Sequence, residues 1–174
     1  MTLRTWQLTA SRFCARFIGY PLILAAAMLT WGVASSAESS DIINMQQISD
    51  LRQEAEIVRA RNLVLVLEFS REDCPYCRKL EKLFLLPMQR NAHYDDKILV
   101  RSISLDANET VIDFAGRSVA TDQFATRYGV SMTPTLLFLN PDGVEIGERL
   151  VGIWSEDFYG YFIDSRIDAA RESL

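Results

Sequence analysis

The sequence of 174 residues predicts an α/β fold in which helices cover both faces of a mixed central sheet. Three observations predict it. The stretch 63–70 is almost continuously apolar and β-branched, as in a central strand buried on both faces. Strand-like and helix-like segments alternate along the middle of the chain, which is typical of a parallel arrangement. Two further strand-like segments, 135–140 and 144–152, flank a Pro-Asp-Gly turn and add an antiparallel pair.

Helices are expected on either side of the central strand. The first covers 49–61, and the second runs from 74 to about 86, where Pro87 ends or kinks it. Their inward residues recur at helical spacing: Leu51, Ala55 and Val58 in the first, Leu80, Leu83 and Phe84 in the second. Residues 97–105 then alternate apolar and polar side chains and predict a second strand.

The remaining segments complete the alternation. Residues 107–120 form a less regular excursion, and 121–129 predict a short helix with Thr121 as its cap and Gly129 as its stop. A final helix begins near Ser155, with two acids in its first turn. It carries the apolar residues Phe158, Tyr161, Phe162 and Ile167.

The N-terminal segment predicts export. Three arginines precede an apolar run at 17–34, no acid occurs before Glu38, and small residues end the run. This pattern predicts a secretory signal over residues 1–37, followed by one domain over 38–174. An uncleaved membrane anchor is the alternative, because the run is close to the shortest length that spans a bilayer.

Cleavage after Ala37 changes the charge and the cysteine count. The remaining chain has 15 basic and 23 acidic residues, a net charge of −8, which disfavours nucleic acid as a partner. Cys14 is lost with the signal, so two cysteines remain. An exported protein with one close cysteine pair is found where disulfides persist.

That pair, in Cys74-Pro75-Tyr76-Cys77, opens a helix directly after a buried strand. Cys74 is therefore expected at the helix N-terminus, where free N–H groups and the helix dipole favour the attacking thiolate. Pro75 suits the first helical position. Cys77 lies one turn further on and deeper, so Cys74 is expected to attack a disulfide and Cys77 to resolve the mixed disulfide.

A structural disulfide or half of a zinc site are the alternatives. A closed zinc site needs four ligands, and the mature chain offers only two cysteines and His93 to a cysteine/histidine set. A three-residue staple stabilises little by the loop-entropy argument. Redox chemistry is therefore the preferred interpretation.

Two further residues bear on the site. Glu68 is a carboxylate within the apolar strand, where it can accept the proton of Cys77 or, alternatively, reach solvent at the strand end. Pro134 comes just before the strand at 135–140 and can begin that strand or follow a cis peptide bond.

From about Leu63 to Gly152 the chain resembles the thioredoxin superfamily in the order of its strands, the CxxC motif, Thr-Pro-Thr and the hairpin. The resemblance implies a thioredoxin fold with Pro134 cis and beside the cysteines. It further implies that the Thr133 backbone pairs with an extended substrate and that Gly152 lets the substrate approach. Glu68 matches the family's buried acid.

The residues around the cysteines depart from thioredoxins. Pro75 and Tyr76 occur between the cysteines, as in many glutaredoxins, and both are expected to touch substrate. Asp73 replaces a tryptophan, and no glutathione-binding Gly-Gly…Asp pattern follows Pro134. The stretches CPYC, DFAG, RYGVSMTPTLLFL and EDFYGYFIDSRIDAA most resemble periplasmic thioredoxins of the SoxW type from bacterial sulfur-oxidation systems.

The resemblance implies a periplasmic thiol–disulfide oxidoreductase that reduces disulfides of exported proteins, sulfur-oxidation proteins among them. It implies a membrane thiol transporter as electron donor, with no metal and no cofactor beyond the Cys74–Cys77 dithiol. A disulfide-forming oxidase is the alternative within this class. A copper chaperone that uses the two cysteines and His93 is the alternative from another class.

Overall fold

The computed structural model describes residues 45–106 and 109–174, and the signal predicted at 1–37 lies outside them. In this part of the chain no helix is long and apolar enough to cross a membrane. The strands of the central sheet are β1 Val64–Ser70, β2 Ile98–Ser104, β5 Thr135–Leu139 and β6 Glu145–Val151. They lie in the order β2-β1-β5-β6, with β1 parallel to β2 and the other pairs antiparallel, so the predicted mixed sheet is confirmed.

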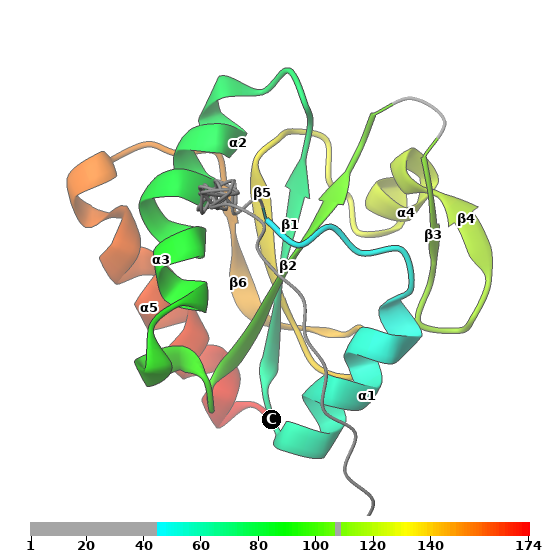
Figure 1. Ribbon diagram of the computed structural model, residues 1–174, viewed down its shortest axis with the longest axis horizontal. Coiled ribbons are helices and arrows are strands. Elements are labelled where there is room, and N and C mark those ends of the chain that lie inside the picture. The colour runs from blue at the N-terminus through cyan, green and yellow to red at the C-terminus, as the bar shows by residue number, and fades with distance from the viewer. Residues whose placement is uncertain (1–44, 107–108) are drawn as a thin grey trace, which may run out of the picture. The chain divides into compact units, whose positions relative to one another are not determined.

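Helices cover both faces of this sheet, as predicted (Figure 1). One face packs against α1 Leu51–Arg61 and α4 Thr121–Arg127. The other packs against α2 Pro75–Leu80, α3 Leu86–Gln89 and α5 Glu156–Glu172. All seven residues of β1 are buried, because this strand lies between two others and beneath two helical layers.

The helix that follows the cysteines does not end at Pro87. A π-turn at Glu81–Leu85 connects α2 to α3, and the Leu86 N–H donates to the Glu81 carbonyl five residues back. This wider turn accommodates the proline ring, which would crowd the carbonyl four residues back in an α-helix. It also moves the inward face by one residue. Leu85 is buried beside half-buried Phe84, whereas Leu83 is 45% exposed, so the prediction for Leu83 was wrong.

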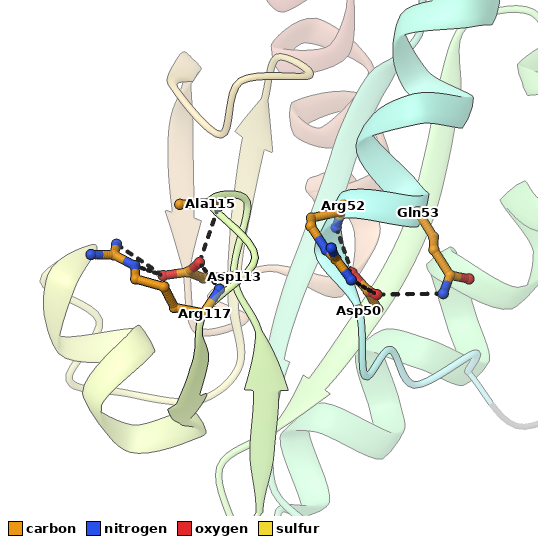
Figure 2. Close-up of polar contacts among 6 residues, drawn as sticks. All are labelled: Asp50, Arg52, Gln53, Asp113, Ala115 and Arg117. Carbon is orange, nitrogen blue, oxygen red and sulfur yellow. Dashed lines mark hydrogen bonds and ion pairs between the residues drawn. The ribbon is translucent and has the colours of Figure 1, made fainter.

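The excursion predicted at 107–120 contains a hairpin. β3 Thr110–Ile112 pairs with β4 Ser118–Ala120 in a second, antiparallel sheet. The Asp113 carboxylate closes its turn by accepting bonds from the backbone N–H groups of Ala115 and Arg117 (Figure 2). The predicted cap of the next helix was one residue off, since Thr121 is already helical and Ala120 takes the cap position.

Side chains define where α1 begins and which face of α5 is buried. Asp50 caps α1 by accepting the Arg52 N–H at 2.9 Å (Figure 2). In α5 the buried stripe is Tyr159, Ile163, Ile167 and Ala170. Of the apolar residues expected on this helix, Phe162 is half-buried and Ile167 is buried, whereas Phe158 and Tyr161 are exposed.

Candidate active site

The cysteines and the proline loop meet at one end of the sheet. β1 ends at Ser70, and a short loop leads from it to Cys74, which is the N-cap residue of α2. β5 is antiparallel to β1, and its first residue, Thr135, lies opposite Phe69. Pro134 therefore precedes β5 at the same end of the sheet at which β1 delivers the cysteines (Figure 1).

Cys74 and Cys77 form a disulfide with their Cα atoms 5.3 Å apart. Cys74 is the N-cap residue, and the Cys77 backbone N–H donates to its sulfur at 3.1 Å. Pro75 occupies the first helical position, which needs no N–H donor. Cys74 retains 9% of its surface in solvent, whereas Cys77 is fully buried. A partner thus reaches Cys74 first, and the same N–H stabilises its thiolate after reduction.

The surroundings of Cys74 are open to a partner. Tyr76 is 60% exposed, as expected, and Pro75 is exposed beside it. Met132, in the loop before the proline, is also exposed. Pro75 and Tyr76 directly follow Cys74, the only cysteine of the pair that has solvent access, so a protein docking there would touch them. The loop with Met132 lies at the same end of the sheet.

Glu68 is buried and does not reach solvent at the strand end, which rules out the solvated alternative. Its two carboxylate oxygens and the Ser102 hydroxyl opposite it on β2 make no hydrogen bond of normal geometry. Burial raises the pKa of Glu68 well above its ordinary value of 4.5. The negative charge of Glu81 adds to the rise, and the nearby Ser102 hydroxyl offsets part of it.

Two residues of this site were missed by the sequence prediction. Glu81 follows Cys77 by one helical turn, and its side chain accepts a long hydrogen bond of 3.4 Å from the Ser70 hydroxyl. Burial raises the pKa of Glu81 as well. Tyr159 is fully buried, and this burial raises the pKa of its hydroxyl, with the nearby charge of Glu68 as the smaller cause. The four-residue spacing from Cys77 was the available signal for Glu81, whereas nothing in the sequence marks Tyr159.

The loop around Pro134 is joined to Gly152. The Thr133–Pro134 peptide bond is cis. The Gly152 N–H donates to the Pro134 carbonyl at 2.8 Å, and the Tyr159 hydroxyl donates to the Gly152 carbonyl at 2.6 Å. Gly152 has φ +69°, in the left-handed region that favours glycine. Among the described residues, none bonds to the backbone N–H or carbonyl of Thr133, which leaves both groups free for another chain.

A cavity of about 430 Å³ borders Thr133, between the loop before the proline and α4. Buried Leu105 and Val130 line it, and Arg71 and Asp122 provide charged groups. Neither of these charged side chains forms an ion pair with another described residue. The cavity thus offers apolar surface and unpaired charge next to a free backbone edge.

His93 does not join the cysteines. It lies on the 3-10 turn Ala92–Tyr94, beyond α3, whereas Cys74 caps the opposite end of the same helical segment. Within 45–106 and 109–174 no three His, Cys, Asp or Glu side chains gather as metal ligands. The three-ligand copper site considered from the sequence therefore has no geometric support.

Comparison with protein families matches residues 51–163 to the thioredoxin-like domain. Comparison with curated proteins finds no match. Among solved structures, the chain is similar to the periplasmic thioredoxin SoxS from Paracoccus pantotrophus, with 21% identity and a TM-score of 0.43. That similarity covers 62% of this chain and 98% of the other.

The C-terminal domain of Neisseria meningitidis DsbD, in its oxidised form, is also similar, with 15% identity, a TM-score of 0.48, and coverage of 69% of this chain and 98% of that domain. Thioredoxin NaTrxh from Nicotiana alata gives 22% identity, a TM-score of 0.44, and coverage of 71% and 95%. The family match spans the central sheet, the Cys74–Cys77 disulfide and the cis-proline loop, and by this match the chain belongs to the thioredoxin-like domain family.

Proposed function

We propose that this chain reduces disulfides of exported proteins through its Cys74–Cys77 dithiol. The unequal access of the two cysteines is the observation that supports this most strongly. In the reduced protein, the Cys74 thiolate attacks one sulfur of the partner disulfide and releases the other as a thiolate. The Cys77 thiolate then attacks the Cys74 sulfur. The second partner thiolate leaves, and the Cys74–Cys77 disulfide remains. Two electrons pass from the dithiol to the partner.

Glu68 is the proposed proton acceptor of the second step. Cys77 is fully buried and must lose its proton before it attacks. The Glu68 carboxylate is the buried base on the strand beneath it, and it carries no hydrogen bond that would compete. A base of raised pKa takes a thiol proton more readily than an ordinary carboxylate does.

A polypeptide in extended form is the proposed partner. The free N–H and carbonyl of Thr133 can pair with a passing strand, and Gly152 has no side chain to obstruct it. The adjacent cavity of about 430 Å³ is large enough to take a side chain of that strand. Exposed Pro75 and Tyr76 complete the contact surface on the cysteine side.

Acidic residues near the dithiol support the reducing direction. A strong oxidant of this class owes its potential to a stabilised reduced form. Here exposed Asp73 precedes Cys74, and Glu81 lies one turn beyond Cys77. Negative charge at both places disfavours a thiolate and so destabilises the reduced form relative to the disulfide. A reduction potential of about −270 mV supports a reductase, and one of about −120 mV establishes the oxidase alternative.

The proposed location is the periplasm, reached through a signal cleaved after Ala37. A SoxW-type role places sulfur-oxidation proteins among the partners and a membrane thiol transporter as the source of electrons. Expression of the full chain in a bacterium, followed by fractionation and N-terminal sequencing, tests the location. A mature chain that begins at Glu38 in the periplasmic fraction is expected. A full-length chain in the membrane fraction supports the anchor instead.

Trapping tests the chemistry. Cys77→Ser is expected to accumulate covalent complexes with exported proteins through Cys74, and these should disappear on addition of dithiothreitol. Cys74→Ser is expected to accumulate none, because Cys77 is sealed from partners. Equal trapping by the two variants would contradict the assignment of roles.

A further inference from the structure

The surroundings of Glu68 contain a second acid, Glu81, that the two-step exchange does not use. Alternate residues of a strand point to the same face, so Glu68 and Ser70 both point where Val66 does. Val66 belongs to the core beneath Leu80 and Tyr159. The helical segment after the cysteines and α5 therefore cover Glu68 and Ser70.

Glu81 faces this pair of residues from the helix. It lies four residues after fully buried Cys77, which places the two on one helical face. Its carboxylate accepts the Ser70 hydroxyl at 3.4 Å, and Ser70 is the next residue on the Glu68 side of β1. Glu81 is only half-buried, whereas Glu68 has no exposed surface. Glu81 is thus the partly exposed acid beside a carboxylate that has no exposed surface of its own.

The polar groups around the two acids are few. From β2 the Ser102 hydroxyl faces Glu68, and from α5 the Tyr159 hydroxyl lies close enough to sense its charge. Burial raises the pKa of Glu81, while the Ser70 hydroxyl and the charge of Arg78 on the helical segment offset part of the rise. Within the described residues neither acid forms an ion pair. Glu81 is therefore the charged neighbour that most affects the pKa of Glu68.

We propose that Glu81 is a positioning residue of the resolving step, acting through Glu68 as the outer member of a carboxylate pair that passes the Cys77 proton to solvent. This inference rests on the proposed function. The Cys77 thiol gives its proton to the Glu68 carboxylate and becomes the thiolate that attacks Cys74. Protonated Glu68 then gives the proton to the Glu81 carboxylate, which releases it to water. Charge and protons balance, and the leaving partner thiolate takes up one proton from solvent.

The pair also sets the pH at which the step operates. An ionised Glu81 opposes ionisation of Glu68, so Glu68 becomes available as a base only at higher pH. Replacing Glu81 with an uncharged residue of the same shape should therefore move the pH midpoint of the resolving rate downward. We expect a shift of about one pH unit, the usual lower size for carboxylates that share a site.

Rapid-mixing kinetics of the Cys74 mixed disulfide, measured against pH in Glu81→Gln, tests this. Glu81→Asp should restore part of the parent profile, and Ser70→Ala, which removes the hydroxyl that holds Glu81, should shift it in the same direction by less. Glu56→Gln makes the same charge change at an exposed position of α1, on the other face of the sheet, and should leave the profile unchanged.

The double variant Glu68→Gln/Glu81→Gln decides whether Glu81 acts through Glu68. We expect Glu81→Gln to have no further effect on the profile once Glu68 is Gln. An unchanged midpoint in Glu81→Gln, or an equal shift in both backgrounds, would overturn the inference while leaving the dithiol function intact. A parent protein that forms no mixed disulfide would overturn the proposed function instead.

Discussion

Replacement of the buried, ionisable Glu68 by a neutral side chain should stabilise the oxidised protein in a pH-dependent way. Below pH 4.5 the carboxyl is protonated in both the folded and the unfolded chain, and it adds no pH dependence. Above pH 4.5 the unfolded chain loses this proton while the folded protein keeps it, because burial holds its folded pKa well above that value. The unfolded chain then binds fewer protons, so stability falls as pH rises.

The slope of this fall sets the magnitude. One group that is protonated only in the folded state costs about 1.4 kcal/mol per pH unit at most, until the pH passes its folded pKa. Glu68→Gln removes this term. Its amide is neutral and finds the same unpartnered surroundings as the protonated carboxyl, whose oxygens have no hydrogen bond. The two proteins should therefore have similar free energies of unfolding near pH 4. As pH rises, the variant should become progressively more stable than the parent.

Denaturant unfolding of the two oxidised proteins at half-unit pH intervals from 4 to 8 measures the difference directly. The difference isolates Glu68 because the other titrating groups occur in both chains. Glu56→Gln, at an exposed position of α1, should remain close to the parent at every pH. A difference between Glu68→Gln and the parent that stays flat with pH, or a variant less stable at pH 8, would refute the view that the folded protein keeps this carboxyl protonated.

Three other outcomes are expected. Glu68→Gln should slow the attack of Cys77 on the mixed disulfide at pH 7 by about 10²-fold or more, while the rate of the first attack by Cys74 changes little. If rapid mixing gives the variant and the parent the same rate for the Cys77 step, Glu68 has no part in the mechanism. The reduced protein should yield Cu(I) and Zn(II) to a competing chelator, and a stoichiometric complex that resists it but is lost in His93→Ala would establish the chaperone alternative. Asp113→Asn should destabilise the protein by about 2 kcal/mol at pH 7. The hydrogen bonds of the hairpin turn and its arginines lower the pKa of Asp113 to about 2. This loss should shrink as pH falls below 3.8, and a constant loss down to pH 2 would contradict the ionic role.

The dithiol site was predictable because its signals are local. A run of apolar residues makes β1, Pro75 and the cysteine spacing mark a helix start, and the order of the two cysteines decides which is deeper. Each of these depends on neighbours within one or two turns of chain. The burial of Glu68 was also predictable, because a central strand beneath two helical layers leaves its side chains no route to water.

The incorrect predictions concern helix positions whose burial depends on backbone conformation and tertiary packing. The π-turn before Pro87 moved the inward face by one residue, from Leu83 and Phe84 to Phe84 and Leu85, since an extra residue in one turn rotates everything that follows. On α5 the pattern of aromatic residues did not reveal which of them face inward. Tyr159 is buried and Phe158 is 65% exposed, because the sheet and Phe84 contact only one side of that helix.

The sequence by itself determined the four strands of the mixed sheet, the helices that cover it, the cysteine pair and the buried acid, because each follows from periodicity, spacing and the chemistry of a short segment. The tertiary structure alone decided that Glu81 and Ser70 share the surroundings of Glu68, and that the Tyr159 hydroxyl bonds to the Gly152 carbonyl. These contacts join residues from different elements, and whether they form depends on the helix phase and on how each layer packs on the sheet. Local sequence patterns carry no information about helix phase or layer packing. The electrostatic interactions of the site therefore follow from the tertiary structure and not from the sequence pattern.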